Sequence, residues 1–108
     1  VSGGIKKAVE AIRSKIPAGI KIEVETADME QVKEALDAKV DIIMLDNMSS
    51  KMMREAVRLI NKKTKIEASG NMTLKRIRKV AATGVDYISI GALTHSVKAL
   101  DISLRVID

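Results

Sequence analysis

The 108-residue sequence contains no cysteine, tryptophan or phenylalanine, and only one tyrosine, one proline and one histidine. Without cysteine, disulfides and thiolate metal sites are excluded, and a reducing, cytoplasmic location is the expectation. Because aromatic residues are almost absent, the core must be filled by Ile, Val, Leu, Ala and the six Met. Apolar runs of secretion-signal or membrane-spanning length are also missing, so we expect no membrane partner.

The composition is 46% hydrophobic and 31% charged, with a net charge of +5, which is typical of one globular domain that tolerates anionic partners. Nucleic-acid binding needs stacking aromatics or a groove-reading motif, and the sequence has neither. We therefore expect no nucleic-acid partner and interpret the basic runs as solvated helix faces. These runs consist of Lys62, Lys63, Lys75, Arg76, Arg78 and Lys79.

The most informative stretch is the apolar run at residues 41–45, which is followed by Asp46 and Asn47. A short apolar run between polar residues is typical of a strand buried on both faces of a parallel sheet. Asp46 then lies at the carboxyl end of that strand, where α/β folds bind ligands. Capping of the next helix is the alternative role for this carboxylate.

Hydrophobic periodicity predicts helices and strands that alternate along the chain. Two helices are expected over residues 4–16 and 93–100. Three more are expected to begin at caps, namely at Asp28, at Ser49 or Ser50, and at Thr73. Gly84 is expected to end the Thr73 helix at C′. Strands are expected at residues 20–25, 41–45, 65–68 and 87–90, while residues 101–108 alternate like a strand but stay ambiguous.

This order predicts an α/β fold with parallel strands joined by right-handed crossovers. If the strands follow sequence order, all helices cover one face, which gives a four-stranded parallel (βα)4 half-barrel as one domain over residues 1–108. The charged alternation of Lys21, Glu23 and Glu25 favours this half-barrel, because a sheet between two helix layers would be apolar on both faces. A flavodoxin-like sheet with helices on both faces is the alternative.

Four strand ends of the predicted sheet carry complementary polar groups. Glu25 and Asp46 are suited to ribose hydroxyls or Mg²⁺. Ser69-Gly70 and Gly91 precede helices, where backbone N–H groups and the helix dipole favour phosphate. Together they predict a sugar-phosphate site.

Five motifs closely resemble quinolinate phosphoribosyltransferase, the carboxylating nicotinate-nucleotide pyrophosphorylase. They are Ile22-Glu-Val-Glu25, Asp41-Ile-Ile-Met-Leu-Asp-Asn-Met48, Glu67-Ala-Ser-Gly70, Thr83-Gly-Val-Asp-Tyr-Ile-Ser-Ile-Gly-Ala-Leu-Thr-His-Ser96 and Leu100-Asp-Ile-Ser103. The resemblance implies an open (β/α) barrel that follows an N-terminal α/β sandwich. It also implies phosphoribosyl transfer from phosphoribosyl pyrophosphate to quinolinate, with Mg²⁺, giving nicotinate mononucleotide, CO2 and pyrophosphate in NAD biosynthesis.

By the same resemblance, each predicted site residue receives a role. Glu25 and Asp46 would hold ribose and Mg²⁺, while Ser69, Gly70 and Gly91 would hold the 5-phosphate. Flanking positions would be Asn47, Asn71, Leu93, Thr94 and His95. For His95, a role beside phosphate or in the structure is favoured over acid–base catalysis.

The sequence also departs from the family pattern. The family's Lys-Asp-Asn-His motif and the arginines that clamp the two carboxylates of quinolinate are absent, and a dianionic substrate needs such fixed donors. Asn71 stands where a second glycine is expected after Gly70. We therefore expect a fragment that is inactive alone and has no bound cofactor. The alternative is an engineered or reconstructed barrel module that binds phosphate weakly.

Self-association follows from the predicted half-barrel. Four sequential strands leave two exposed edges, and two chains supply the eight strand–helix units of a closed barrel. Ile43 or Met44 must lie on the inner face of such a barrel. Lys21 and Lys65 could there neutralise glutamates of a second chain. A homodimer is therefore expected.

Overall fold

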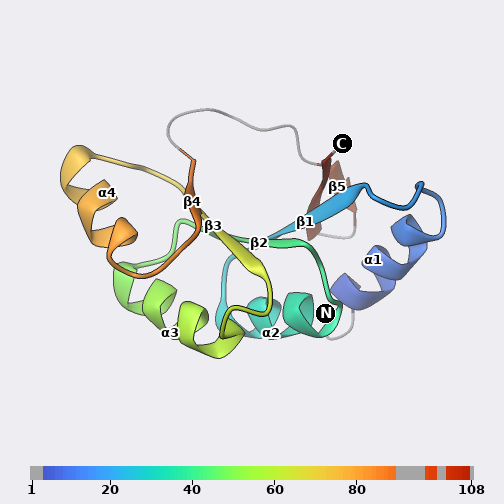
Figure 1. The fold of residues 1–108 in the computed structure, drawn as a ribbon, viewed down its shortest axis with the longest axis horizontal. Helices are drawn as coiled ribbons and strands as arrows, with labels where there is room; N and C mark the ends of the chain where they lie inside the picture. Colours follow the sequence, from blue (N-terminus) through green and yellow to red (C-terminus); the bar gives the residue numbers. More distant parts are fainter. Residues whose placement is uncertain (1–3, 90–96, 100–101, 108) are drawn as a thin grey trace.

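The computed structural model describes residues 4–89, 97–99 and 102–107 of the chain (Figure 1). The elements in order are α1 (Gly4–Arg13), β1 (Lys21–Thr26), α2 (Met29–Asp37), β2 (Ile42–Asp46), α3 (Ser50–Ile60), β3 (Lys65–Ser69), α4 (Leu74–Ala81), β4 (Tyr87–Ile88), β5 (Val97–Ala99) and β6 (Ile102–Ile107). None of the helices in this described part is long and apolar enough to span a bilayer.

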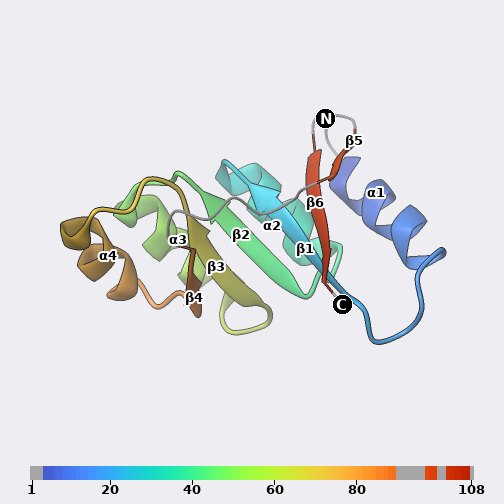
Figure 2. The ribbon, with the colours of Figure 1, turned by 90° about the horizontal axis from the view of Figure 1, so that it is seen from above.

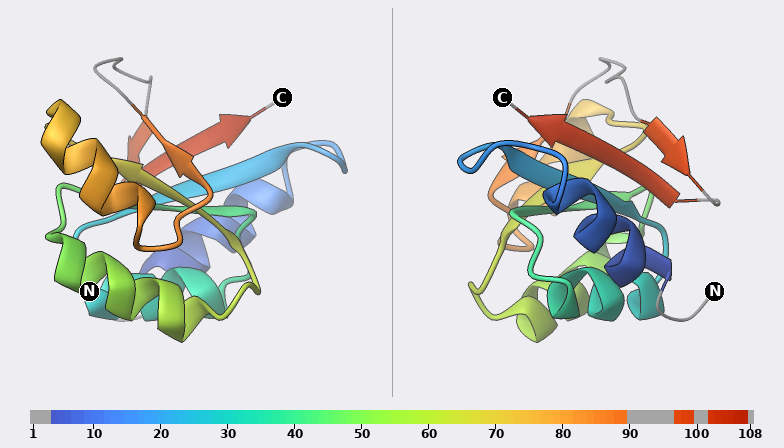
Figure 3. Two further views of the ribbon diagram at one scale, coloured as in Figure 1. Left: turned by 60° about the vertical axis from the view of Figure 1, so that its left-hand side comes forward. Right: turned by 90° about the vertical axis from the view of Figure 1, so that its right-hand side faces the viewer.

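The six strands form one sheet in the order β4-β3-β2-β1-β6-β5. Strands β1 to β4 are parallel and stand in sequence order. The helices pack in the same order, each against the next, and cover one side of the sheet (Figures 1 and 3). This arrangement confirms the (βα)4 half-barrel, and the flavodoxin-like alternative is wrong because it needs a reordered sheet.

The C-terminal hairpin corrects the expected helix over residues 93–100 and the expected exposed edge, and it shows that the ambiguous segment contains a strand. Residues 97–99 form β5 instead of continuing a helix over residues 93–100, and residues 102–107 form β6. Strand β6 runs antiparallel beside β1 (Figure 2), so β1 has no exposed edge. The physical reason is that the N–H and C=O groups of a strand edge need partners, and a hairpin from the same chain supplies them.

Three helices begin at the caps that the sequence predicts. Before α2, Asp28 accepts a hydrogen bond from the Gln31 N–H at 2.8 Å, while the Gln31 side chain accepts from the Ala27 N–H at 2.7 Å, one residue before the cap, so the arrangement is a variant of the capping box. Ser49 caps α3 and Thr73 caps α4. Gly84 adopts a positive φ of 98°, but the C-cap of α4 is Ala82, so this glycine lies one position beyond the expected C′.

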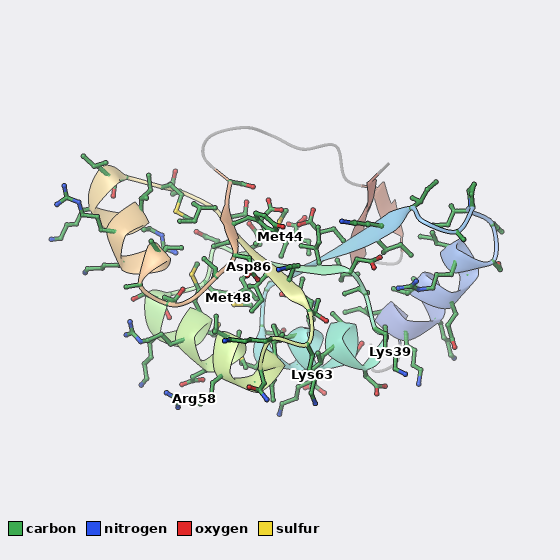
Figure 4. All side chains as sticks on the ribbon, viewed as in Figure 1. Lys39, Met44, Met48, Arg58, Lys63 and Asp86 are labelled. Atoms are coloured by element: carbon green, nitrogen blue, oxygen red, sulfur yellow. The ribbon has the colours of Figure 1, made fainter. Side chains whose placement is uncertain are left out.

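The core lies between the sheet and the helices and is aliphatic, as the composition predicts. Its fully buried side chains include Ile22, Val24, Val32, Ile43, Leu45, Met53, Ile60 and Val80. The opposite face of the sheet, here called the inner face, carries Glu23, Glu25, Ile42, Met44, Asp46, Glu67 and Ser69, as the strand registers require. Figure 4 shows Met44 on that face and Met48 on the helix side.

The chain contains two similar strand–helix–strand units, which the fold makes visible. Lys21-Ile-Glu23 begins β1, and the same triplet, Lys65-Ile-Glu67, begins β3. Asp41 precedes β2 and accepts a hydrogen bond from the N–H of Ile22, the second residue of β1, at 2.8 Å. Asp86 precedes β4 and accepts from the N–H of Ile66, the second residue of β3, also at 2.8 Å. Each unit therefore fixes the start of its strand pair in the same way.

The Asp86 contact gives a testable prediction about stability. Asp86→Ala is expected to lower the free energy of unfolding by about 1 kcal/mol, because a backbone N–H loses its carboxylate partner. Urea denaturation measures the change. Asp37→Ala removes an exposed carboxylate whose 3.5 Å ion pair with Lys6 is a surface contact, so it serves as the control and should change little. Equal effects of the two variants would contradict the prediction.

Candidate functional site

The carboxyl ends of β1, β2 and β3 bring the predicted polar residues to one end of the sheet, here called the C-terminal rim. Asp46 and Ser69 are direct Cα partners in the parallel pairing of β2 with β3. Glu25 pairs with Met44, so its carboxylate stands on the same face as Asp46, one step diagonally across. All three are partly exposed. The rim therefore presents two carboxylates and a hydroxyl to one accessible region.

Backbone groups of the β2–α3 loop (residues 47–49) and the β3–α4 loop (residues 70–73) meet at this rim. The Asn47 N–H donates to the Ser69 carbonyl at 2.8 Å, and Asn47 has a positive φ of 54°. Gly70 has a φ of 130°, and a Cβ built on it would lie 3.0 Å from the Asn47 Cα. A side chain at Gly70 would thus collide with backbone, which explains the glycine at the predicted phosphate position.

Two helix starts point their positive ends at the same rim. Neither α3 nor α4 has an acidic residue in its first turn. Lys51 lies in the first turn of α3, and Lys75 and Arg76 lie in that of α4. Because these cations add to the positive ends of the two helix dipoles, this part of the rim favours an anion.

The flanking residues have different outcomes. Asn47 and Asn71 both lie at the rim with exposed side chains, but only Asn47 uses a left-handed backbone conformation. Asn71, which stands where the family pattern has a second glycine, does not adopt a positive φ. Four predicted positions lie outside the described residues, namely Gly91, Leu93, Thr94 and His95.

The inner face also holds a contact that the sequence did not reveal. Glu67 is 7% exposed, and its carboxylate accepts a hydrogen bond from the Ser89 hydroxyl. Glu23, at the equivalent position of the first unit, is also buried, and each of these glutamates takes part in at least one polar or electrostatic interaction. The repeated Lys-Ile-Glu was the available signal, because it places a glutamate at the same depth in both units.

Arg76 is a second residue that the sequence reading missed. It was assigned to a solvated basic face, but its guanidinium donates to the Met48 carbonyl in the β2–α3 loop and is partly buried. Its neighbours Lys75, Arg78 and Lys79 are exposed, as expected. No local pattern separates Arg76 from these neighbours, because its partner lies 28 residues earlier in the chain.

A groove with a volume of about 1090 Å³ lies at the opposite end of the strands. Its lysines follow or face the carboxyl ends of α2 and α3, where cations offset the negative end of the helix dipole. The lining includes Lys33, Lys39, Lys62, Lys63 and Lys65, with Asp37, Asp41 and Asp86. These three aspartates all have partners, and a structural explanation of the groove suffices.

The carboxylates at the C-terminal rim are compatible with an Mg²⁺ ion that takes most of its ligands from a bound substrate and water. Within the described ranges, no three His, Cys, Asp or Glu side chains gather as a metal cluster. Mg²⁺ commonly uses only one or two protein carboxylates and takes its other ligands from substrate phosphates and water. Glu25 and Asp46 fit an ion that arrives with a phosphorylated ligand.

The fold defines a class: half of a (β/α) barrel, with two carboxylates, a hydroxyl and a glycine at its strand ends. A family model described as "Quinolinate phosphoribosyl transferase, C-terminal domain" matches residues 1–105, and the chain belongs to this family.

Known relatives agree with this family. The chain is 45% identical to a probable carboxylating nicotinate-nucleotide pyrophosphorylase of Synechocystis, with 98% of this chain and 37% of that protein covered. It is also 45% identical to the mitochondrial quinolinate phosphoribosyltransferase 2b of Nicotiana tabacum, over 97% and 35%. The crystal structure of nicotinate-nucleotide pyrophosphorylase from Ehrlichia chaffeensis matches with a TM-score of 0.78 and 39% identity, covering 96% and 38%. The chain thus spans about a third of these relatives, whose C-terminal part it matches.

The Asn47–Gly70 approach gives a prediction about the rim. Gly70→Ala is expected to destabilise the protein by about 1–3 kcal/mol, because alanine would be strained at this φ and its Cβ would collide with the Asn47 backbone. Thermal denaturation monitored by circular dichroism measures the loss.

Gly19→Ala is the matched control for Gly70→Ala. Gly19 also has a positive φ, of 95°, but a Cβ there meets nothing within 4 Å. This control carries the backbone strain without the collision, so its loss should be smaller. A loss at Gly19 as large as that at Gly70 would show that the close approach is unimportant.

Proposed function

We propose that this chain supplies the phosphoribosyl-binding part of a quinolinate phosphoribosyltransferase. In this proposal Ser69, Gly70 and Gly91 hold the 5-phosphate, and Glu25 and Asp46 hold the ribose hydroxyls. The pairing of Asp46 with Ser69 at the end of adjacent strands carries the proposal, because it sets a carboxylate beside the phosphate position. Ribose 5-phosphate needs these two chemistries at neighbouring points.

Mg²⁺ belongs to the same proposal. Glu25 and Asp46 would hold the ion, which would neutralise charge on the pyrophosphate of phosphoribosyl pyrophosphate when that substrate binds. Asn47 and Asn71 would flank the ligand, together with Leu93, Thr94 and His95. No step of the reaction is assigned to these flanking residues.

Catalysis by these 108 residues alone is not part of the proposal. A dianionic pyridine dicarboxylate needs fixed arginine donors, and those of the family pattern are absent from this sequence. Because positioning supplies much of such catalysis, a partial site contributes little. We further propose a cytoplasmic location on the absence of cysteine, although the printed name of a tobacco relative places that protein in mitochondria.

Ligand titration tests the site. Ribose 5-phosphate is expected to bind with a dissociation constant on the order of millimolar, because few contacts offset the freedom that the ligand loses. In ¹⁵N-resolved NMR spectra, the Gly70 amide should shift as ligand is added. Asp46→Asn should weaken ribose 5-phosphate binding by up to about tenfold, because the ribose hydroxyls lose a charged acceptor. The affinity for inorganic phosphate should stay the same or rise slightly, because Asp46→Asn removes a negative charge.

Asp37→Asn is the matched control for Asp46→Asn, because it removes an exposed carboxylate far from the rim. Its titration should resemble that of the unaltered chain. Shifts confined to the α4 residues Lys75–Lys79 would indicate unspecific anion binding and reject the site. The same samples, mixed with quinolinate and phosphoribosyl pyrophosphate, should form no nicotinate mononucleotide.

A homodimer is the second proposal. Because β6 occupies the β1 edge, the sheet edges in the described part of the chain are β4 and β5, and we place the second copy along β4. This edge has only a two-residue ladder, and its Tyr87 is 50% exposed. An exposed edge with an aromatic side chain favours pairing with another chain.

The dimer proposal makes its own prediction. Light scattering at micromolar concentration should give twice the 11.8 kDa of the chain. Tyr87→Lys should restore the monomer mass, because a charge on an edge strand opposes edge pairing. Leu59→Lys, on the surface of α3 and also exposed, is the matched control and should remain dimeric. A monomer mass for the unaltered chain would reject the dimer.

A further inference from the structure

Arg76 stands at a position that local helix energetics disfavours. It lies in the first turn of α4, where its positive charge faces the positive end of the helix dipole. It is also partly buried, unlike the other basic residues of this helix. A contact outside the helix must therefore stabilise the side chain, and the hydrogen bond to the Met48 carbonyl is that contact.

The acceptor of this bond belongs to the loop that carries Asn47. Met48 is anchored by its side chain, which is 3% exposed in the core. The preceding Asn47 has a left-handed backbone, a conformation that non-glycine residues adopt only when their surroundings hold them there. The Asn47 N–H donates to the Ser69 carbonyl at 2.8 Å, and the Met48 carbonyl accepts from the Arg76 guanidinium. Both bonds come from the second strand–helix–strand unit.

We propose that Arg76 is a positioning residue that holds the β2–α3 loop against the β3–α4 loop, and so sets the selectivity of the rim for ribose 5-phosphate over inorganic phosphate. The inference rests on the proposed function of the rim. Inorganic phosphate uses no residue of the β2–α3 loop, because the residues proposed for the phosphate, Ser69 and Gly70 among them, lie later in the chain. Ribose 5-phosphate must also reach Asp46, which ends the strand leading into the other loop.

The consequence is a selective effect. When the Arg76 hydrogen bond is lost, the β2–α3 loop is no longer held at the distance from the β3–α4 loop that ribose 5-phosphate spans. Ordering the β2–α3 loop on binding then costs part of the binding free energy. Only the ligand that uses both loops bears this cost. A general loss of folding, or a loss of positive charge near the rim, would weaken both ligands instead.

The experiment compares two ligands on the same chain by ¹⁵N-resolved NMR titration. For Arg76→Met, which keeps an apolar stem and removes every donor, ribose 5-phosphate should bind several-fold more weakly, with inorganic phosphate changed by less than twofold. Arg76→Lys keeps one donor for the carbonyl and should retain most of the selectivity. Arg78→Met removes an exposed charge from the same helix and should change neither ligand's affinity beyond twofold.

Each outcome decides between the alternatives. Equal weakening of both ligands in Arg76→Met, no weakening of either, or a failure of Arg76→Lys to retain selectivity would overturn the positioning role. If Arg76→Met proves too unstable to titrate, Arg76→Leu, which also removes every donor, replaces it with the same expected result. If the unaltered chain already binds both ligands equally, the proposed function of the rim fails, which is a different result.

Discussion

The close approach of Asn47 to Gly70 is the constraint on which the rim depends. A hydrogen bond of 2.8 Å from the Asn47 N–H extends the β2–β3 pairing beyond the last ladder residues. The approach is possible because Gly70 has no Cβ and because Asn47 accepts a left-handed backbone. Without it, the two loops would diverge, and Asp46 and Ser69 would end adjacent strands without forming one site.

The sequence predicted the part of the fold that depends on local chemistry. Caps at Asp28, Ser49 and Thr73 and the alternation of residues 20–25 each rest on neighbours a few residues apart, and the structure confirms them. The covering of the β1 edge by β6 was not predicted, because the alternation within each segment indicates a strand but does not say which strand it pairs with. The shortness of residues 101–108 also concealed their role.

The same division applies to the site. Glu25, Asp46, Ser69 and Gly70 could be placed at one rim because parallel strands end at the same edge, whatever their side chains contact. The contacts of Arg76 with Met48 and of Ser89 with Glu67 could not be placed, because each joins segments more than 20 residues apart. Residue type alone indicated a solvated face for Arg76, and only the three-dimensional contact distinguishes it from Arg78.

The two strand–helix–strand units explain why the rim divides into two chemistries. Their strand starts are alike, since Asp41 and Asp86 hold Ile22 and Ile66 by the same 2.8 Å hydrogen bond. Their strand ends differ, because the strands of the first unit end in the carboxylates Glu25 and Asp46, whereas β3 of the second unit ends in Ser69-Gly70. A shared scaffold at one end of the sheet fixes the geometry, and the other end is free to vary. In the proposed function, the junction between the units, between β2 and β3, is where a ligand with both a sugar and a phosphate would meet both chemistries, and Asn47, Gly70 and Arg76 all lie there.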